Sequence, residues 1–152
     1  MAFKTLLVPL DKSHLNHKVL TTALNIAERF DAQVVTLRIR KEVAALDMED
    51  EDHTRIDLDI IDNETQALVD ETVKTLGPGA AGRITADVRS GPVVDTIVAA
   101  AEELQADLIV MGTHGRRGVA EFFTGSTTEQ VVAKTPVSVM VIKPSGFPYL
   151  RD

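Results

Sequence analysis

The stretch that decides the fold of this 152-residue chain is Leu108-Ile109-Val110-Met111-Gly112. Four apolar residues in a row, followed at once by a glycine, are typical of a short strand that is buried on both faces. The segment 3–10, which contains Leu6-Leu7-Val8, has the same character near the other end of the chain. Strands covered on both faces belong to a parallel sheet between two layers of helices. The sequence therefore predicts an α/β protein.

Helical and strand-like segments alternate along the rest of the chain. Ser13 is the expected N-cap of the first helix, Gly77-Pro78-Gly79 ends the second, and Pro92 takes the first position of the third. We predict strands at 3–10, 33–39, 84–89, 108–111 and 137–142, and helices at 14–30, from about 61 to 76, at 92–104 and at 126–135. This alternation predicts one Rossmann-like domain over 1–152, an open five-stranded parallel sheet in the order 3-2-1-4-5 with helices on both faces.

The charge of the chain is concentrated in one segment. Lys and Arg number 16 against 23 Asp and Glu, a formal net charge of −7. Residues 42–64 hold ten acidic residues and one basic residue, a net −9, so the remainder carries +2. We interpret 42–64 as an acidic variable arm in solvent; binding of a basic protein or a divalent cation are the alternatives. Net acidity argues against proteins that coat nucleic acid or anionic membranes.

Composition excludes several other classes of protein. The chain has no cysteine, so it has neither disulfides nor thiolate metal sites. No window approaches the ~18 apolar residues of a membrane-spanning helix, and the N-terminal apolar run is too short for a secretion signal. We therefore expect a cytoplasmic protein without membrane insertion.

The predicted topology places a ligand site at one edge of the sheet. In such folds ligands bind at the carboxyl ends of the strands, where the strand order reverses. Here that edge lies between the end of the first strand, at Pro9 and Asp11, and the end of the fourth, from Met111 onward. Taken alone, Asp11 is better explained as a capping residue of the first helix.

The loop 112–125 has the composition of a phosphate-binding site. Gly112 and Gly115 allow a tight turn and a close approach to a ligand. Gly125 precedes a helix start, where free N–H groups and the hydroxyls of Ser126 and Thr127 favour an anion. The loop matches neither a Walker A sequence nor a dinucleotide fingerprint. The alternative to a phosphate-binding loop is that these are ordinary turn and capping glycines. Arg116 and Arg117 either bind phosphate or face solvent.

The spacing of these glycines matches that of a known family. Gly112-x2-Gly115-x9-Gly125-Ser126 follows the pattern G-2x-G-9x-G-(S/T), so the chain resembles the nucleotide-binding branch of the universal stress protein family. The first strand, with Pro9 and Asp11, and the last strand, after Pro136, resemble the family as well. The resemblance implies an ATP-binding α/β domain, usually a homodimer, that acts in stress adaptation or signalling.

The resemblance also implies a nucleotide site made of ten residues: Pro9, Asp11, Ile39, Met111, Gly112, Gly115, Gly125, Ser126, Thr127 and Thr128. By this comparison Asp11 contacts the ribose, the phosphates and a Mg²⁺ ion, and Pro9 and Ile39 line the adenine pocket. Met111, Gly112 and Gly115 wrap the ribose and phosphates, and residues 125–128 bind phosphates. Lys12 departs from the family pattern, in which a glycine is common at this position.

The last predicted strand suggests self-association. Its residues are apolar on both faces: Val137, Val139 and Val141 alternate with Ser138, Met140 and Ile142. A sheet edge of this kind favours pairing with a second copy, so we predict a two-fold homodimer in which the two copies of 137–142 pair antiparallel.

A zinc site formed by His14, His17 and His114 is a weak alternative to solvated histidines.

The leading hypothesis is a cytoplasmic, dimeric regulator that binds ATP, or ADP or AMP, with Mg²⁺ and acts on an unidentified protein partner. No pair of nucleophile and base is evident, so we assign no catalytic residue. The enzyme alternative is slow ATP hydrolysis, or autophosphorylation at Ser126 or Thr127. An interaction module without nucleotide is the third hypothesis, which the intact glycines disfavour.

Overall fold

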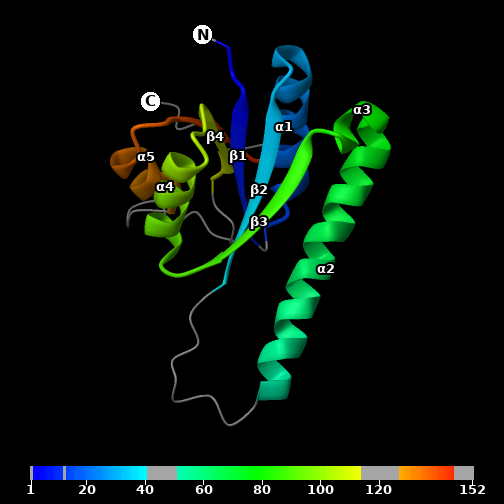
Figure 1. The fold of residues 1–152 in the computed structure, drawn as a ribbon, viewed down its shortest axis with the longest axis vertical. Coiled ribbons are helices and arrows are strands. Elements are labelled where there is room, and N and C mark those ends of the chain that lie inside the picture. Colours follow the sequence, from blue (N-terminus) through cyan, green and yellow to red (C-terminus); the bar gives the residue numbers. More distant parts are fainter. Residues whose placement is uncertain (1, 12, 41–50, 114–126, 146–152) are drawn as a thin grey trace.

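The computed structural model describes residues 2–11, 13–40, 51–113 and 127–145, with only the backbone described for 51–62. Its strands form one parallel sheet in the order β3-β2-β1-β4-β5 (Figure 1). The strands are β1 Thr5–Leu10, β2 Gln33–Arg40, β3 Ile84–Ser90, β4 Leu108–Gly112 and β5 Ser138–Ile142. The predicted fold class and strand order are confirmed.

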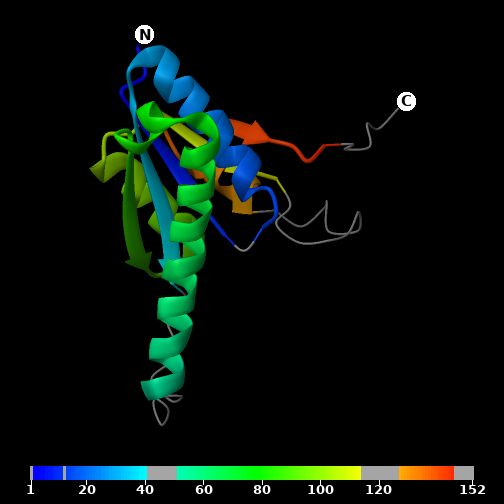
Figure 2. The ribbon, with the colours of Figure 1, turned by 90° about the vertical axis from the view of Figure 1, so that its right-hand side faces the viewer.

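Helices cover both faces of this sheet (Figure 2). The longer helices are α1 Asn16–Phe30, α2 Glu51–Leu76, α4 Val93–Glu103 and α5 Thr127–Lys134. Successive strand residues point to opposite faces, so each strand contributes to two cores. Leu6 and Val8 pack with α1 and with the C-terminal part of α2, whereas Leu7 and Ile109 pack with α4 and α5.

The direction in which strands are added to the sheet changes at β1. The chain passes from β1 to β2 and β3 on one side, then continues with β4 and β5 on the other. Across the junction Leu6 pairs with Leu108 and Leu7 pairs with Ile109. The carboxyl ends of β1 and β4 therefore lie beside each other at the point where the strand order reverses, as predicted.

Helix α1 begins two residues later than predicted, and Ser13 does not cap it. The residue that flanks the helix, Leu15, makes no side-chain capping hydrogen bond. Instead, Ser13 Oγ accepts a hydrogen bond from the Leu15 N–H at 3.0 Å. A short hydroxyl side chain can bond its own backbone two residues on, and here this bond stabilises a turn before the helix.

Several other boundaries differ from the prediction by one or two residues. β1 begins at Thr5 rather than at residue 3, and β5 begins at Ser138 rather than at residue 137. Pro92 flanks α4 instead of being its first residue, because its backbone is extended, with φ −61° and ψ 129°. The predicted helix start at Ser126 lies outside the described residues.

Helix α2 is longer than the sheet beside it. Its 26 residues span about 39 Å at the helical rise, so its N-terminal half extends past the carboxyl edge of the sheet (Figure 1). The helix ends before Gly77, which has a φ of +98°, and the short helix α3 Pro78–Ala81 follows, which we did not predict. Among the described residues, no helix combines the length and the apolar character that crossing a membrane requires.

Candidate functional site

The turn after β1 holds an aspartate at the carboxyl edge of the sheet. Asp11 is exposed, and its Oδ1 accepts a hydrogen bond from the Ser13 N–H at 2.7 Å. Its backbone carbonyl accepts another from Asn16 Nδ2 at 2.6 Å. Asp11 therefore forms an Asx-turn and does not cap α1 itself. The two bonds give both the carboxylate and the backbone of Asp11 a defined orientation.

Arg38 reaches the same turn from β2. It stands in register with Leu10, the last residue of β1, and one guanidinium nitrogen donates a hydrogen bond to the Asp11 carbonyl at 2.5 Å. Arg38 is only 7% exposed. Sequence reasoning assigned it no role. The signal that could have found it is a charged residue near the end of a strand that is otherwise buried.

Gly112 ends β4 in close contact with α1. A Cβ at this position would lie 3.3 Å from Leu15 Cδ1 and 3.4 Å from Val19 Cγ2, so the glycine lets the helix approach the strand. The next residue, Thr113, donates its N–H to the Ile142 carbonyl at 3.0 Å. Its hydroxyl Oγ1 is buried and has no hydrogen-bond partner in the described structure.

The first turn of α5 is attached to the end of β4. Thr128 is buried, and its Oγ1 donates a hydrogen bond to the Gly112 carbonyl at 2.8 Å. Thr127, beside it, is exposed. The first N–H groups of a helix lack partners within the helix and carry the positive end of its dipole. The Thr128 bond therefore brings an anion-attracting helix start to the edge where β1 and β4 end.

Three apolar residues lie one position before the ends of their strands at this same edge. Pro9 and Ile39 are half-buried, and Met111 is 5% exposed. Ile39 and Met111 pack with the core that α4 and α5 cover. Together they give the carboxyl edge an apolar surface beside the polar Asp11 turn.

The structure thus places seven predicted site residues at the ends of β1, β2 and β4 and at the start of α5: Pro9, Asp11, Ile39, Met111, Gly112, Thr127 and Thr128. Gly115, Gly125 and Ser126 lie outside the described residues, as do Lys12, His114, Arg116 and Arg117. Asn16, Arg38 and Thr113 are neighbours of the site that sequence reasoning did not assign to it.

Asp11 is the residue that we predicted as a metal ligand. Among the described side chains, no group of three or more His, Asp or Glu residues is arranged to hold a metal ion. A Mg²⁺ ion at Asp11 would take its other ligands from phosphate oxygens and water, which is its usual coordination beside nucleotides. His14 and His17 are exposed and belong to no such group in this part of the chain; His114 lies outside it.

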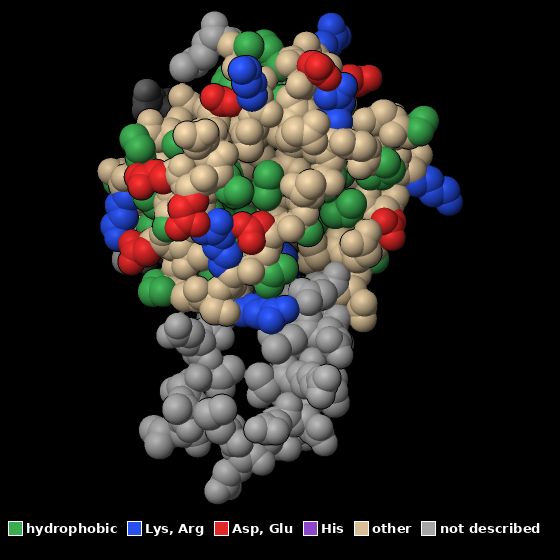
Figure 3. Space-filling view, viewed as in Figure 1, with side chains coloured by type: hydrophobic (Ala, Val, Ile, Leu, Met, Phe, Trp, Pro, Cys, Tyr) green, Lys and Arg blue, Asp and Glu red, His purple; other side chains and the backbone are tan. Residues whose placement is uncertain are grey.

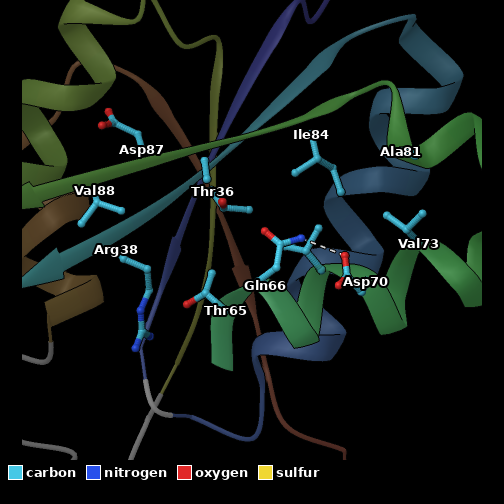
Figure 4. A pocket seen from close by; sticks show the side chains of 12 residues that line it. Thr36, Arg38, Thr65, Gln66, Asp70, Val73, Ala81, Ile84, Asp87 and Val88 are labelled. Carbon is cyan, nitrogen blue, oxygen red and sulfur yellow. Dashed lines mark hydrogen bonds between the residues drawn. The ribbon is translucent and has the colours of Figure 1, made fainter. Parts of the chain in front are cut away.

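A hollow lies beneath α2, away from the junction of β1 and β4. It has a volume of about 340 Å³ between α2 and the strands β2 and β3 (Figure 4). Thr36 and Arg38 line it from β2, and Gln66 and Asp70 line it from α2. The Gln66 amide donates a hydrogen bond to Asp70 Oδ1 at 2.8 Å. Arg38 thus lines this hollow and also bonds the Asp11 turn.

The amino-acid sequence is similar to known proteins over almost its whole length. The sequence model of the Universal stress protein family matches residues 2–143. The chain is 28% identical over 141 residues to Universal stress protein MJ0531 of Methanocaldococcus jannaschii, a match that covers 93% of this chain and 82% of that protein.

Solved structures share the fold. UspA from Lactobacillus plantarum superposes with a TM-score of 0.78 at 26% identity, over 93% of this chain and 99% of that chain. A universal stress protein in complex with cAMP has a TM-score of 0.66 at 20% identity, covering 94% of this chain and 98% of its own. A universal stress protein from Archaeoglobus fulgidus in complex with dAMP has a TM-score of 0.60 at 20% identity, covering 94% and 100%. Because both nucleotide complexes are only 20% identical to this chain, they show that the fold is shared.

Proposed function

Because the chain belongs to the universal stress protein family, we propose that it binds an adenine nucleotide at the carboxyl ends of β1 and β4. Proteins of the same fold hold cAMP and dAMP, which supports an adenosine phosphate as the class of ligand. ATP with Mg²⁺ is the form that we propose, and ADP and AMP are the alternatives.

The single observation that carries this proposal is the buried Thr113 hydroxyl. Among the described residues it has no hydrogen-bond partner, and leaving a buried hydroxyl unpaired costs about 1–3 kcal/mol. Thr113 directly follows Gly112, whose carbonyl anchors the start of α5. A ribose or phosphate oxygen bound at this edge would give the Thr113 hydroxyl an acceptor, so the residues present fit the proposed ligand.

Each neighbouring group then has a role that its chemistry suits. The Asp11 carboxylate accepts hydrogen bonds from the ribose hydroxyls or contacts Mg²⁺, and the apolar ends of Pro9, Ile39 and Met111 face the adenine. Residues 111–115 surround the ribose, and residues 125–128 bind the phosphates. Because the Thr128 hydroxyl already donates to Gly112, Thr128 contributes its backbone N–H at the helix start.

We propose further that the protein is a homodimeric regulator rather than a metabolic enzyme. β5 is an edge strand of the sheet, and its Met140 and Val141 are 37% and 36% exposed. Pairing of β5 with a second copy would cover both side chains. Stress adaptation or signalling through an unidentified protein partner in the cytoplasm is the role that the family suggests.

Mass spectrometry of the ligand that acid releases from the purified protein tests the proposed function. We expect ATP, ADP or AMP, and we expect Mg-ATP to raise the Tm of protein from which the nucleotide has been removed. Gly115→Val should abolish this shift while leaving the protein folded by circular dichroism. Absence of both a released nucleotide and a Tm shift would refute nucleotide binding and favour an interaction module.

A further inference from the structure

We propose that Arg38 is a positioning residue that holds the Asp11 carboxylate at the nucleotide site, a role that rests on the proposed function. Arg38 lies outside the glycine loop and outside the set of residues expected to contact the nucleotide. It acts on the ligand through the β1–α1 turn.

The position of Arg38 lets it fix this turn from a separate strand. In-register pairing places Arg38 beside Leu10, and its side chain points away from β2 towards the segment that follows β1 (Figure 4). There it donates to the Asp11 carbonyl at 2.5 Å. A hydrogen bond from a charged donor is stronger than one between neutral groups. Because Arg38 as a whole is only 7% exposed, its guanidinium also needs such acceptors, since burying a charge without them is costly.

The other bonds of the turn are local in sequence. Ser13 and Asn16, which bond Asp11 Oδ1 and the Asp11 carbonyl, lie within five residues of Asp11. They hold the turn to the start of α1. Arg38 is 27 positions away along the chain, so its bond holds the same peptide group to the sheet. With Asn16 and Arg38 both donating, the Asp11 carbonyl is fixed between helix and sheet, and the direction of the Asp11 side chain is fixed with it.

Loss of the Arg38 bond should loosen Asp11 without unfolding the sheet. Methionine is the suitable replacement, because it keeps an apolar stem against β2 and α2 while removing every donor. Arg38→Lys keeps one charged donor and should retain part of the effect. Arg83→Met is the matched control: Arg83 also bonds a backbone carbonyl, that of Ala32 at 3.3 Å, but at the amino end of the sheet.

The first measurement is made on the nucleotide-free protein, by ¹⁵N relaxation. A rigid backbone has an order parameter of about 0.85 and a flexible one falls below about 0.6. We expect the order parameters of the Asp11 and Ser13 amides to fall towards the flexible value in Arg38→Met. They should change less in Arg38→Lys and stay unchanged in Arg83→Met. Unchanged order parameters at Asp11 and Ser13 in Arg38→Met would overturn the positioning role, whether or not the protein binds nucleotide.

The second measurement is a double-mutant cycle with Mg-ATP by isothermal titration calorimetry. Arg38→Met should weaken binding about tenfold in the wild-type background, the worth of one charge-assisted hydrogen bond. In the Asp11→Asn background it should weaken binding less than about twofold, because its effect passes through Asp11. An equal loss in both backgrounds would overturn the inference and show that Arg38 acts independently of Asp11. If the wild type does not bind Mg-ATP, the proposed function fails, and the order parameters still decide whether Arg38 holds the turn.

Discussion

At the residue scale, Thr113 allows binding and stability to be separated. Its buried hydroxyl has no partner in the described structure, so Thr113→Val removes an unsatisfied polar group and replaces it with a methyl of similar size. We expect the Tm without nucleotide to stay equal or to rise. We expect the affinity for Mg-ATP to fall about three- to tenfold, because one hydrogen bond to the ligand is lost.

Thr21 provides the matched control for this prediction. Its Oγ1 is likewise buried without a partner among the described residues, but it lies within α1. Thr21→Val should give a similar change in Tm and no change in nucleotide affinity. If both variants bind Mg-ATP as the wild type does, the Thr113 hydroxyl does not contact the nucleotide.

The hydrogen bonds of the Asp107 carboxyl should make the stability of the fold depend on pH. Its Oδ2 accepts the backbone N–H groups of Lys4 at 2.7 Å and Thr5 at 3.0 Å. These bonds, that of Lys4 first, lower the pKa of the Asp107 carboxyl below its usual value. A carboxyl whose pKa is lower in the folded state stabilises the fold above its unfolded pKa, about 3.9, and that contribution is lost as the pH falls through the folded pKa.

Urea unfolding of wild type and Asp107→Asn between pH 7 and about pH 2.5 tests this dependence. The wild type should be the more stable protein at neutral pH, and the difference in the free energy of unfolding should shrink on acidification below about pH 4. A difference that stays constant over this range would show that the Asp107 charge does not contribute.

Which site residues the sequence could predict depends on what their roles require. Gly112 and Asp11 belong to short patterns of spacing and turn chemistry, so the sequence alone predicted them as site residues. The roles of Arg38 and Thr113 depend on the folded structure. Arg38 bonds a carbonyl 27 residues away in the sequence, and the buried Thr113 hydroxyl has no partner in the described structure. For Arg38 the sequence offers one hint, a charged residue near the end of a strand that is otherwise buried, whereas Thr113 has no local sequence signal.

At the element scale, the attachment of α5 to β4 depends on Thr128. The Oγ1 of the buried Thr128 bonds the Gly112 carbonyl at 2.8 Å, so Thr128→Val leaves this carbonyl without that donor. We expect a loss of about 1–3 kcal/mol in the free energy of unfolding, measured by urea denaturation. The exposed neighbour gives the control, since Thr127→Val should change stability by less than about 0.5 kcal/mol. Equal effects of both variants would exclude a special role for the Thr128 bond.

The elements themselves were predictable because their hydrophobic patterns are long and regular. The five strands and the parallel sheet follow from apolar runs and from the alternation of strands and helices, and the predicted strand order agrees with the structure. Ends of elements were less predictable. The late start of α1 depends on whether Ser13 bonds the N–H of Leu15 or of a later residue, and α3 has only four residues, too few for a periodic pattern.

At the scale of the whole molecule, the concentrated acidic charge and the predicted self-association belong to different parts of the chain. Away from the acidic arm, Lys and Arg side chains lie among Asp and Glu side chains on the face shown in Figure 3. Such a mixed surface creates little long-range field. It therefore offers little repulsion to the nucleoside triphosphate that we propose as the ligand.

Self-association should depend on the edge strand β5. We expect the wild type to sediment as a dimer at micromolar concentration, and Val141→Lys to sediment as a monomer, because a lysine on an edge strand disfavours pairing. Val132, which is 51% exposed on α5, supplies the control, and Val132→Lys should remain dimeric. A monomeric wild type, or a dimer that survives Val141→Lys, would place the interface elsewhere or remove it.

The measurement that tests nucleotide binding at the junction of β1 and β4 most directly is a titration of ¹⁵N-labelled protein with Mg-ATP, followed by amide chemical shifts. We predict saturable changes centred on Asp11, Gly112, Thr113 and Thr127, with little change at Gln66 in the hollow beneath α2. No saturable change at the first four amides, or changes centred on Gln66 instead, would contradict the proposed site.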